Sequence, residues 1–354
     1  MTADAVLATD PVFQLNVLLW ALEDLPDVAV VNPVLRRAGY ELESIGRSLL
    51  VPAGEPTAGV LQDIAGSPDR SPCRPDLCIF HQDDPATIVV ELKSHGFSRD
   101  SSNIRQAVKL ILASHDLSAS YAETLPRPGH VVYGTVASDA ASLAETLQDL
   151  SESVAARGLS AAPTGTVGIS IDVEGAKLSA SGLSELPEPA QRALDPSATV
   201  LPRTGEDDIR PLYVIPWTPG IEGTQDGELQ ADGYRELTAR VIVEAMSIVG
   251  QANVPTSLDI SGATLLRRST FGVFGRWLDA DRQQFAAAAA GVLTKTLQSV
   301  ESFQKRSRDT FSLSLSSHDE QEEVIRLLES AKPVDDKTNI AATINEELQL
   351  FNGF

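Results

Sequence analysis

Three charged residues stand at the ends of two apolar segments, where their types and spacing could support phosphodiester hydrolysis. Asp76 opens the apolar segment 77–80, and Glu91 and Lys93 close the apolar segment 87–92. Two carboxylates and an ammonium group, once brought together, can hold a divalent cation and a water molecule beside a phosphate. This chemistry depends on the elements that carry the three side chains.

The two segments are predicted to be neighbouring antiparallel strands. Residues 88–90 are β-branched and apolar, which is typical of a strand covered on both faces. Only the short polar stretch 81–85 separates the segments, so a tight turn should pair them. Glu91 and Lys93 are two residues apart and should point to the same side of their strand. Asp76, at the start of the first strand, should then lie beside Glu91 at the end of the second.

Two adjacent carboxylates repel each other unless a cation lies between them. Few protein ligands and room for water suit Mg²⁺ or Mn²⁺. Lys93 could orient or polarise a metal-bound water, or offset the charge of a phosphate in the transition state. Taken singly, Asp76 is more simply a strand-start cap, and Glu91 with Lys93 an exposed cross-strand pair. The prediction therefore depends on the three residues occurring together.

The combination of Pro75-Asp76, 14 intervening residues and Glu91-Leu92-Lys93 resembles the motif of the PD-(D/E)XK phosphodiesterase superfamily, the restriction-endonuclease-like nucleases. The resemblance implies that Asp76 and Glu91 bind the metal ion, helped by the backbone carbonyl of Leu92. It also implies that Lys93 assists the attacking water. It covers about the first half of the chain and leaves the second half unexplained.

A helix is predicted over 101–112, with an apolar stripe that would pack on the strands. Members of the superfamily commonly place a polar residue of this helix near the site, and Gln106 resembles the glutamine of the RecB-like branch. That branch usually has a tyrosine four residues further on, where this chain has Leu110. Arg105 and Lys109 of the same helix are candidate nucleic-acid contacts.

The first helix is predicted over 11–25, with Asp10 as its N-cap and Pro11 in its first turn. Many members of the superfamily supply a glutamate from this helix as a metal ligand. Glu23 is the candidate here, and Glu41 is the second choice. The apolar run of this helix is too short to span a bilayer, so no membrane association is expected.

The remaining segments of residues 1–217 predict an α/β domain with a mixed central sheet flanked by helices, a restriction-endonuclease-like core. The expected elements besides the motif strands are β-type pieces at 28–31 and 48–51, a turn-rich loop at 54–72, a strand at 131–136, a helix at 140–157, a strand at 166–173, an irregular linker or excursion at 174–210 and a last core strand at 211–217.

Residues 218–354 are predicted to form a mainly helical domain with an acidic helical tail, with helices at 234–249, 279–297, 320–331 and 340–350. Arg267, Arg268 and Arg276 alternate with aromatic residues. They could form a nucleic-acid-contacting element, or a helix pair with an aromatic core and solvated arginines, which is the preferred interpretation. The basic cluster 305–308 is predicted to be a solvated helix face.

The chain is strongly acidic, with 28 Lys and Arg against 49 Asp and Glu and a formal net charge of −21. This charge opposes non-specific attraction to nucleic acid, which depends on local Lys and Arg, and it would suit a basic partner protein. The two cysteines, Cys73 and Cys78, form neither a zinc-binding nor a disulfide pattern. A reducing cytoplasm is therefore expected.

The sequence thus predicts a nuclease dependent on Mg²⁺ or Mn²⁺, a DNA endonuclease in a restriction or phage-defence setting. A homodimer would be compatible with this activity, because one site cuts one strand. Two alternatives remain. One is a catalytically silent nuclease fold that serves as a scaffold or DNA-recognition subunit of a multiprotein complex, favoured by the charge and opposed by the intact motif. The other is an interaction protein whose helical half carries the function.

Overall fold

The computed structural model describes residues 3–25, 31–99, 101–180, 186–203, 209, 212–216, 231–277 and 279–332. The described residues divide into two compact units, the first reaching residue 209 and the second beginning at Leu212. Within these ranges no helix is both long and apolar enough to cross a membrane.

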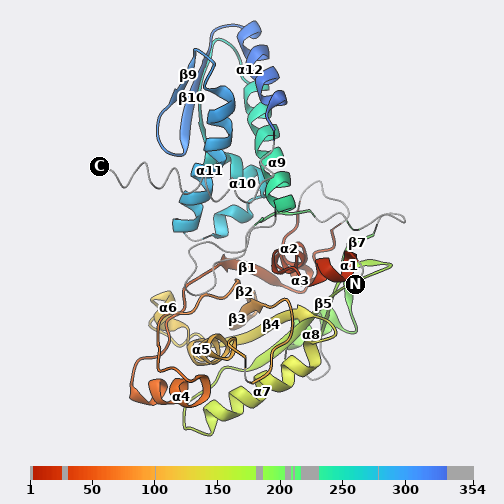
Figure 1. Ribbon diagram of the computed structural model, residues 1–354, viewed down its shortest axis with the longest axis vertical. Coiled ribbons are helices and arrows are strands. Elements are labelled where there is room, and N and C mark those ends of the chain that lie inside the picture. The colour runs from red at the N-terminus through yellow and green to blue at the C-terminus, as the bar shows by residue number, and fades with distance from the viewer. Residues whose placement is uncertain are drawn as a thin grey trace. The chain divides into compact units, whose positions relative to one another are not determined.

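The first unit is an α/β structure built on a seven-stranded mixed sheet, as the sequence predicted (Figure 1). The strands lie in chain order, so each is a neighbour of the next. The central strands β3, β4 and β5 are parallel, and the other pairs are antiparallel. The strands are β1 (Tyr40–Ile45), β2 (Leu77–His81), β3 (Asp84–Leu92), β4 (Gly129–Val136), β5 (Thr164–Asp172), β6 (Gly175–Ala180) and β7 (Ala198–Pro202).

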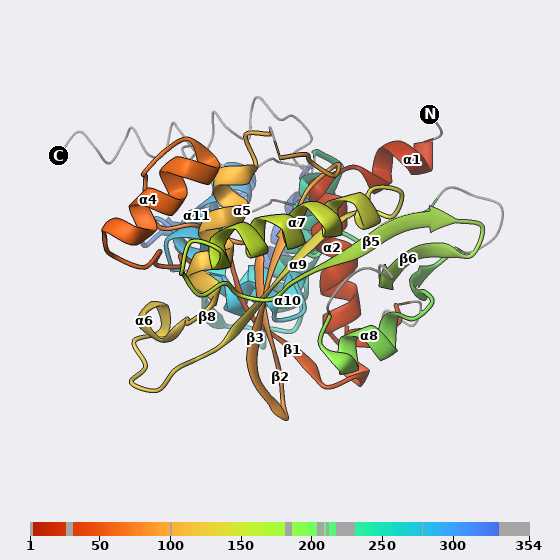
Figure 2. The same cartoon turned by 90° about the horizontal axis from the view of Figure 1, so that it is seen from below.

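Helices cover both faces of this sheet, with α2 on one face and α5 and α7 on the other (Figures 1 and 2). Side chains alternate across the sheet, so Val90 faces the α2 layer while Val89 lies in the core with α5 and α7. The helices of the unit are α1 (Ala3–Ala8), α2 (Pro11–Leu22), α3 (Val34–Arg37), α4 (Glu55–Ala65), α5 (Ile104–Ser114), α6 (Ser118–Tyr121), α7 (Ala140–Ala155) and α8 (Glu188–Leu194).

The start of α2 confirms the predicted cap, because the Asp10 side chain accepts a hydrogen bond from the backbone N–H of Phe13. Every residue of α2 after Pro11 is buried. The amides of Gln14 and Asn16 donate to backbone carbonyls of the same segment, which makes their burial tolerable. The helix ends at Leu22, three residues earlier than predicted.

Several predictions for the first unit were wrong. The expected loop at 54–72 contains α4, which is followed by the C-cap residue Gly66 in the left-handed conformation. The expected linker at 174–210 contains β6, α8 and β7, which extend the sheet by an antiparallel pair. The piece at 48–51 makes only the isolated bridge between Leu49 and Cys73, and β1 was not predicted at all. Most of the piece at 28–31 lies outside the described residues.

The second unit is mainly helical, as predicted, but it also contains a three-stranded antiparallel sheet in the order β8-β10-β9. Residues 212–216 belong to this unit and form no strand, which corrects the expected last core strand. Residues 340–350 lie outside the described range. The elements are α9 (Ala231–Gly250), β8 (Thr256–Ser261), α10 (Gly262–Ser269), the 3-10 helix η1 (Val273–Arg276), α11 (Asp279–Leu297), β9 (Phe303–Lys305), β10 (Thr310–Leu315) and α12 (His318–Ser330).

Candidate functional site

The hairpin of β2 and β3 brings Asp76 and Glu91 together. The strands are antiparallel and Leu77 pairs with Val90, so the next pair of positions is Asp76 and Glu91. The backbone N–H of Leu92 donates to Oδ2 of Asp76 at 2.7 Å, which ties the acid to the end of β3. The predicted convergence of the two acidic residues is therefore present in the structure.

Lys93 joins the same cluster from the end of β3. Its Nζ donates to Oε1 of Glu91 at 2.8 Å and to Oε1 of Gln106 at 3.0 Å. Glu91 and Lys93 point to the same side because they are two residues apart in an extended chain. An ammonium group carries three N–H donors, and within the described part of the chain these two acceptors use two of them. One donor remains for a water or a phosphate oxygen.

The position of Gln106 follows from the connection between β3 and β4. These strands are parallel, so the chain must cross back over the sheet, and α5 makes this crossover. Ser101 Oγ accepts a hydrogen bond from the N–H of Asn103 just before the helix begins. Burial of the apolar face of α5 on the sheet then places Gln106, in the first turn, over Lys93.

The two acids are almost inaccessible, with Asp76 7% exposed and Glu91 3% exposed. Burial, and the nearby Glu91 carboxylate, raise the pKa of Asp76 well above its usual range. Burial also raises the pKa of Glu91, although the Lys93 ammonium opposes this shift. Burial lowers the pKa of Lys93, but Glu91 and Asp76 more than offset that effect and the net pKa is raised. The cluster holds more negative charge than one lysine neutralises.

The donor set fits a small divalent cation. Oε2 of Glu91 is buried and has no hydrogen-bond partner among the described residues. The N–H of Leu92 faces Asp76, and in an extended strand the carbonyl of a residue points to the same side as its N–H. Two carboxylates and a carbonyl match Mg²⁺, which takes one or two carboxylates and completes its shell with water and phosphate. Within the described ranges the site thus brings two acidic side chains together, and no group of three or more His, Cys, Asp or Glu side chains is placed to hold a metal ion.

Of the two predicted third carboxylates, Glu41 lies away from the site. Glu41 lies on β1 opposite Phe80, several residues from the Asp76 end of β2, and it pairs with Arg36 at 2.8 Å. Glu23 is the C-cap residue that follows α2, and its backbone N–H donates to the carbonyl of Leu19. It forms no metal-binding group with Asp76 and Glu91 among the described residues. The Glu41 assignment is corrected, because β1 places this residue toward the other end of β2, whereas the Glu23 assignment stays a prediction.

The two candidate nucleic-acid contacts on α5 differ in how far their side chains are buried. Arg105 is exposed on α5, beside Gln106. Lys109 is fully buried, and its Nζ donates to Asp69 and Ser71 at 2.8 Å each. This burial excludes Lys109 as a phosphate contact in the present conformation and corrects its assignment. The Lys109 ammonium also lowers the pKa of Asp69 to about 2.

The basic and aromatic segment of the second unit follows the preferred interpretation. Arg267, Arg268 and Arg276 are exposed, whereas Phe274 and Trp277 are buried. Arg268 lies 3.7 Å from Glu244. The basic cluster at 305–308 is not a helix face, because Lys305 is the last residue of β9 and residues 306–308 lie in the connection to β10.

One residue of the site was missed in the sequence. Tyr133 of β4 is the parallel-strand partner of Glu91 and is completely buried. Burial, with the charges of Glu91 and Asp76, raises the pKa of Tyr133 well above its usual range, so its hydroxyl stays a hydrogen-bond donor. The register between β3 and β4 places it there, and no local motif signals that register. His95, by contrast, lies 3.5 Å from Asp139 with a side chain that is 64% exposed.

Comparisons with known proteins found no matching family model, no similar curated protein and no similar solved structure.

The raised pKa values predict proton-linked metal binding. A metal ion needs ionised carboxylates, so its binding should release a proton wherever the free site is still protonated. The Mn²⁺ affinity should rise about tenfold per pH unit above the ordinary carboxyl range and level off above the raised pKa of Asp76. Calorimetric titration of Mn²⁺ in buffers of different ionisation enthalpy measures both the affinity and the protons released. An affinity that is flat across this window, with no proton release, would show that these acids do not bind the ion.

The same raised pKa values predict that the metal-free protein becomes less stable as the pH rises. A carboxyl group whose pKa is raised in the folded state stabilises that state below the ordinary pKa. This contribution is lost as the pH rises through the raised pKa. The metal-free protein should therefore lose stability as the pH increases, and Mn²⁺ should restore it.

Proposed function

We propose that this protein is a metal-dependent nuclease of the PD-(D/E)XK type that hydrolyses phosphodiester bonds. The observation that carries the proposal is the meeting of Asp76, Glu91, Lys93 and Gln106 from two strands and a helix in one buried cluster. Such a cluster costs stability, since two buried acids share one cation. A fold that needed only stability would be better served by apolar residues here.

Each residue of the cluster has a distinct part in the proposed reaction. Asp76 and Glu91, with the Leu92 carbonyl, would hold Mg²⁺ or Mn²⁺. The bound ion would polarise the phosphate and lower the pKa of a coordinated water. Lys93 directs its remaining N–H to the water or to a phosphate oxygen and offsets the negative charge that develops in the transition state. Gln106 fixes the Lys93 ammonium through the 3.0 Å hydrogen bond.

The proposed substrate is DNA, cut internally, and the proposed setting is cytoplasmic restriction or phage defence. The exposed Arg105 beside Gln106 is the candidate phosphate contact near the site. Arg267, Arg268 and Arg276 offer a separate exposed basic segment on the second unit.

One observation favours a second candidate, a nuclease fold that recognises DNA or serves as a scaffold within a complex without cutting. The formal charge of −21 disfavours unaided binding to a polyanion. A basic partner protein would relieve this repulsion. The isolated chain would then bind its partner and leave DNA intact.

The cleavage assay separates the two candidates. The purified full chain should cut plasmid and single-stranded DNA with Mg²⁺ or Mn²⁺, and it should leave both intact when EDTA is present. RNA of the same sequence, tested in parallel, defines the substrate class. An absence of metal-dependent cutting on all of these substrates, together with a basic protein that copurifies, would support the scaffold instead.

A further inference from the structure

Tyr133 and Glu91 are side-by-side neighbours on the central parallel strands. Paired residues of adjacent parallel strands point to the same face of a sheet, and here that face is the one covered by α5 and α7. The ring of Phe97 packs against the ring of Tyr133 edge-on, with centroids 5.5 Å apart. This packing fixes the tyrosine ring beside the end of β3 that carries Glu91.

Both residues carry a polar atom that the described part of the chain leaves without a hydrogen bond. These atoms are the Tyr133 hydroxyl and Oε2 of Glu91. A buried polar atom without a partner costs about 1–3 kcal/mol. The first atom can donate and the second accepts, yet they are not bonded to each other. Neighbouring side chains that carry an unpartnered donor and an unpartnered acceptor can be bridged by one buried water.

We propose that Tyr133 is a positioning residue for the metal site. Its hydroxyl donates, through one ordered water, toward Glu91 and holds that carboxylate in the orientation that a divalent ion requires. This inference rests on the proposed function, because it assigns Glu91 as a metal ligand. Outer partners of metal ligands typically change metal affinity by about 10- to 100-fold when they are removed.

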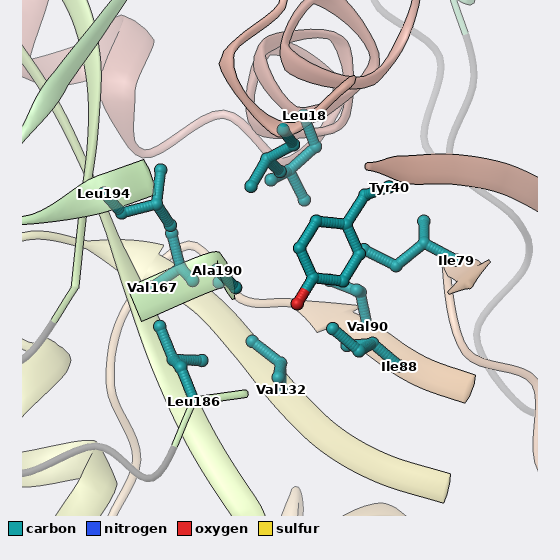
Figure 3. Close-up of a pocket in the computed structure, with 12 residues that line it drawn as sticks. Leu18, Tyr40, Ile79, Ile88, Val90, Val132, Val167, Leu186, Ala190 and Leu194 are labelled. Carbon is teal, nitrogen blue, oxygen red and sulfur yellow. The ribbon is translucent and has the colours of Figure 1, made fainter. Parts of the chain in front are cut away.

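The same sheet offers a matched control in Tyr40. Tyr40 of β1 is 1% exposed, and its hydroxyl also lacks a hydrogen-bond partner among the described residues. It lies on the opposite face, in a cavity of about 30 Å³ whose lining is aliphatic apart from Tyr40 itself. Figure 3 shows its hydroxyl oxygen directed into this cavity, near side chains such as Val90, Val132 and Ala190. Loss of this hydroxyl should not affect a metal site on the other face.

The test compares Tyr133→Phe and Tyr40→Phe in the full chain by calorimetric titration with Mn²⁺ and by thermal unfolding without metal. Tyr133→Phe should weaken Mn²⁺ binding about tenfold and leave the unfolding temperature of the metal-free protein nearly unchanged. Tyr40→Phe should bind Mn²⁺ like the wild type. Wild-type affinity in Tyr133→Phe, or equal weakening in both variants, would overturn the inference.

The outcomes for the inference and for the proposed function are distinguishable. If the wild type binds Mn²⁺ and cuts DNA while Tyr133→Phe does so equally well, only the inference fails. If the wild type neither binds Mn²⁺ nor cuts, the proposed function fails and the inference with it. A high-resolution crystal structure of the wild type adds an independent check. It should show a water within hydrogen-bond distance of both atoms, and a dry contact there would contradict the bridge.

Discussion

Asp76→Asn is expected to abolish metal-dependent cleavage, with a rate at least about a thousandfold below wild type, which is about 4 kcal/mol of transition-state stabilisation. Asparagine keeps the oxygen that accepts the 2.7 Å hydrogen bond from Leu92, so the local backbone should be preserved. It removes the negative charge that Mg²⁺ or Mn²⁺ requires. Cleavage rates at saturating metal, with Mn²⁺ affinity measured in parallel, test this expectation.

The same substitution should stabilise the metal-free protein at neutral pH. Asp76 is buried beside a second carboxylate, and its raised pKa reflects that cost. Removal of the charge should raise the unfolding temperature of the metal-free protein, because it removes the cost of burying one carboxylate beside another. A gain in stability together with a loss of function would separate a catalytic role from a structural one.

A control for this variant lies at the end of another strand of the same sheet. Asp172 ends β5 and pairs with Lys177 at 2.8 Å, outside the candidate site. Asp172→Asn should retain wild-type cleavage. Equal cleavage by the Asp76→Asn protein and the wild type would refute the assignment of Asp76.

Lys93→Met is expected to slow cleavage by about 100- to 1,000-fold, the range for loss of one electrostatic group aimed at a developing charge. Methionine retains much of the aliphatic length but cannot donate to Glu91, Gln106 or the substrate. Mn²⁺ binding should survive, because the change removes a positive charge beside the carboxylates. The metal-free protein should be destabilised, since Glu91 then remains buried without its cation.

Lys109→Met is the matched control for Lys93→Met. Lys109 is also a buried lysine of the first unit with a carboxylate partner, but its partner is Asp69 rather than the site. The Lys109→Met protein should cut DNA at the wild-type rate. If both methionine variants lost activity to the same extent, the loss would reflect a disturbed core, and Lys93 would have no specific role.

The candidate site could be predicted from the sequence because its geometry is local. A tight turn pairs β2 with β3, and the pairing alone brings Asp76 opposite Glu91. The period of two along a strand places Lys93 with Glu91. The helix with Gln106 follows directly and must cross the sheet before β4. These contacts could be predicted because the residues are close in the sequence and the β-branched pattern of the strands is strong.

The errors arose where distant packing decides the structure. The Gly- and Pro-rich stretch at 54–72 forms α4, because Val60 and Leu61 pack into the core with α5. β6 and β7 are short and lie in a stretch rich in Ser, Pro, Ala and Gly, so their pairing with the sheet edge defines them. Lys109 carries a charge that predicts exposure, and only the tertiary fold supplies Asp69 as its partner.

The central claim is that the Asp76 and Glu91 carboxylates share one divalent cation, and a crystal structure with Mn²⁺ tests it most directly. The account predicts one anomalous-scattering peak about 2 Å from an oxygen of each carboxylate, with the Lys93 ammonium beside it. The peak should be absent in Asp76→Asn crystals grown in the same way. A protein that cuts DNA with Mn²⁺ but binds the ion elsewhere, or whose two acids stay free of metal at saturating Mn²⁺, would contradict the account.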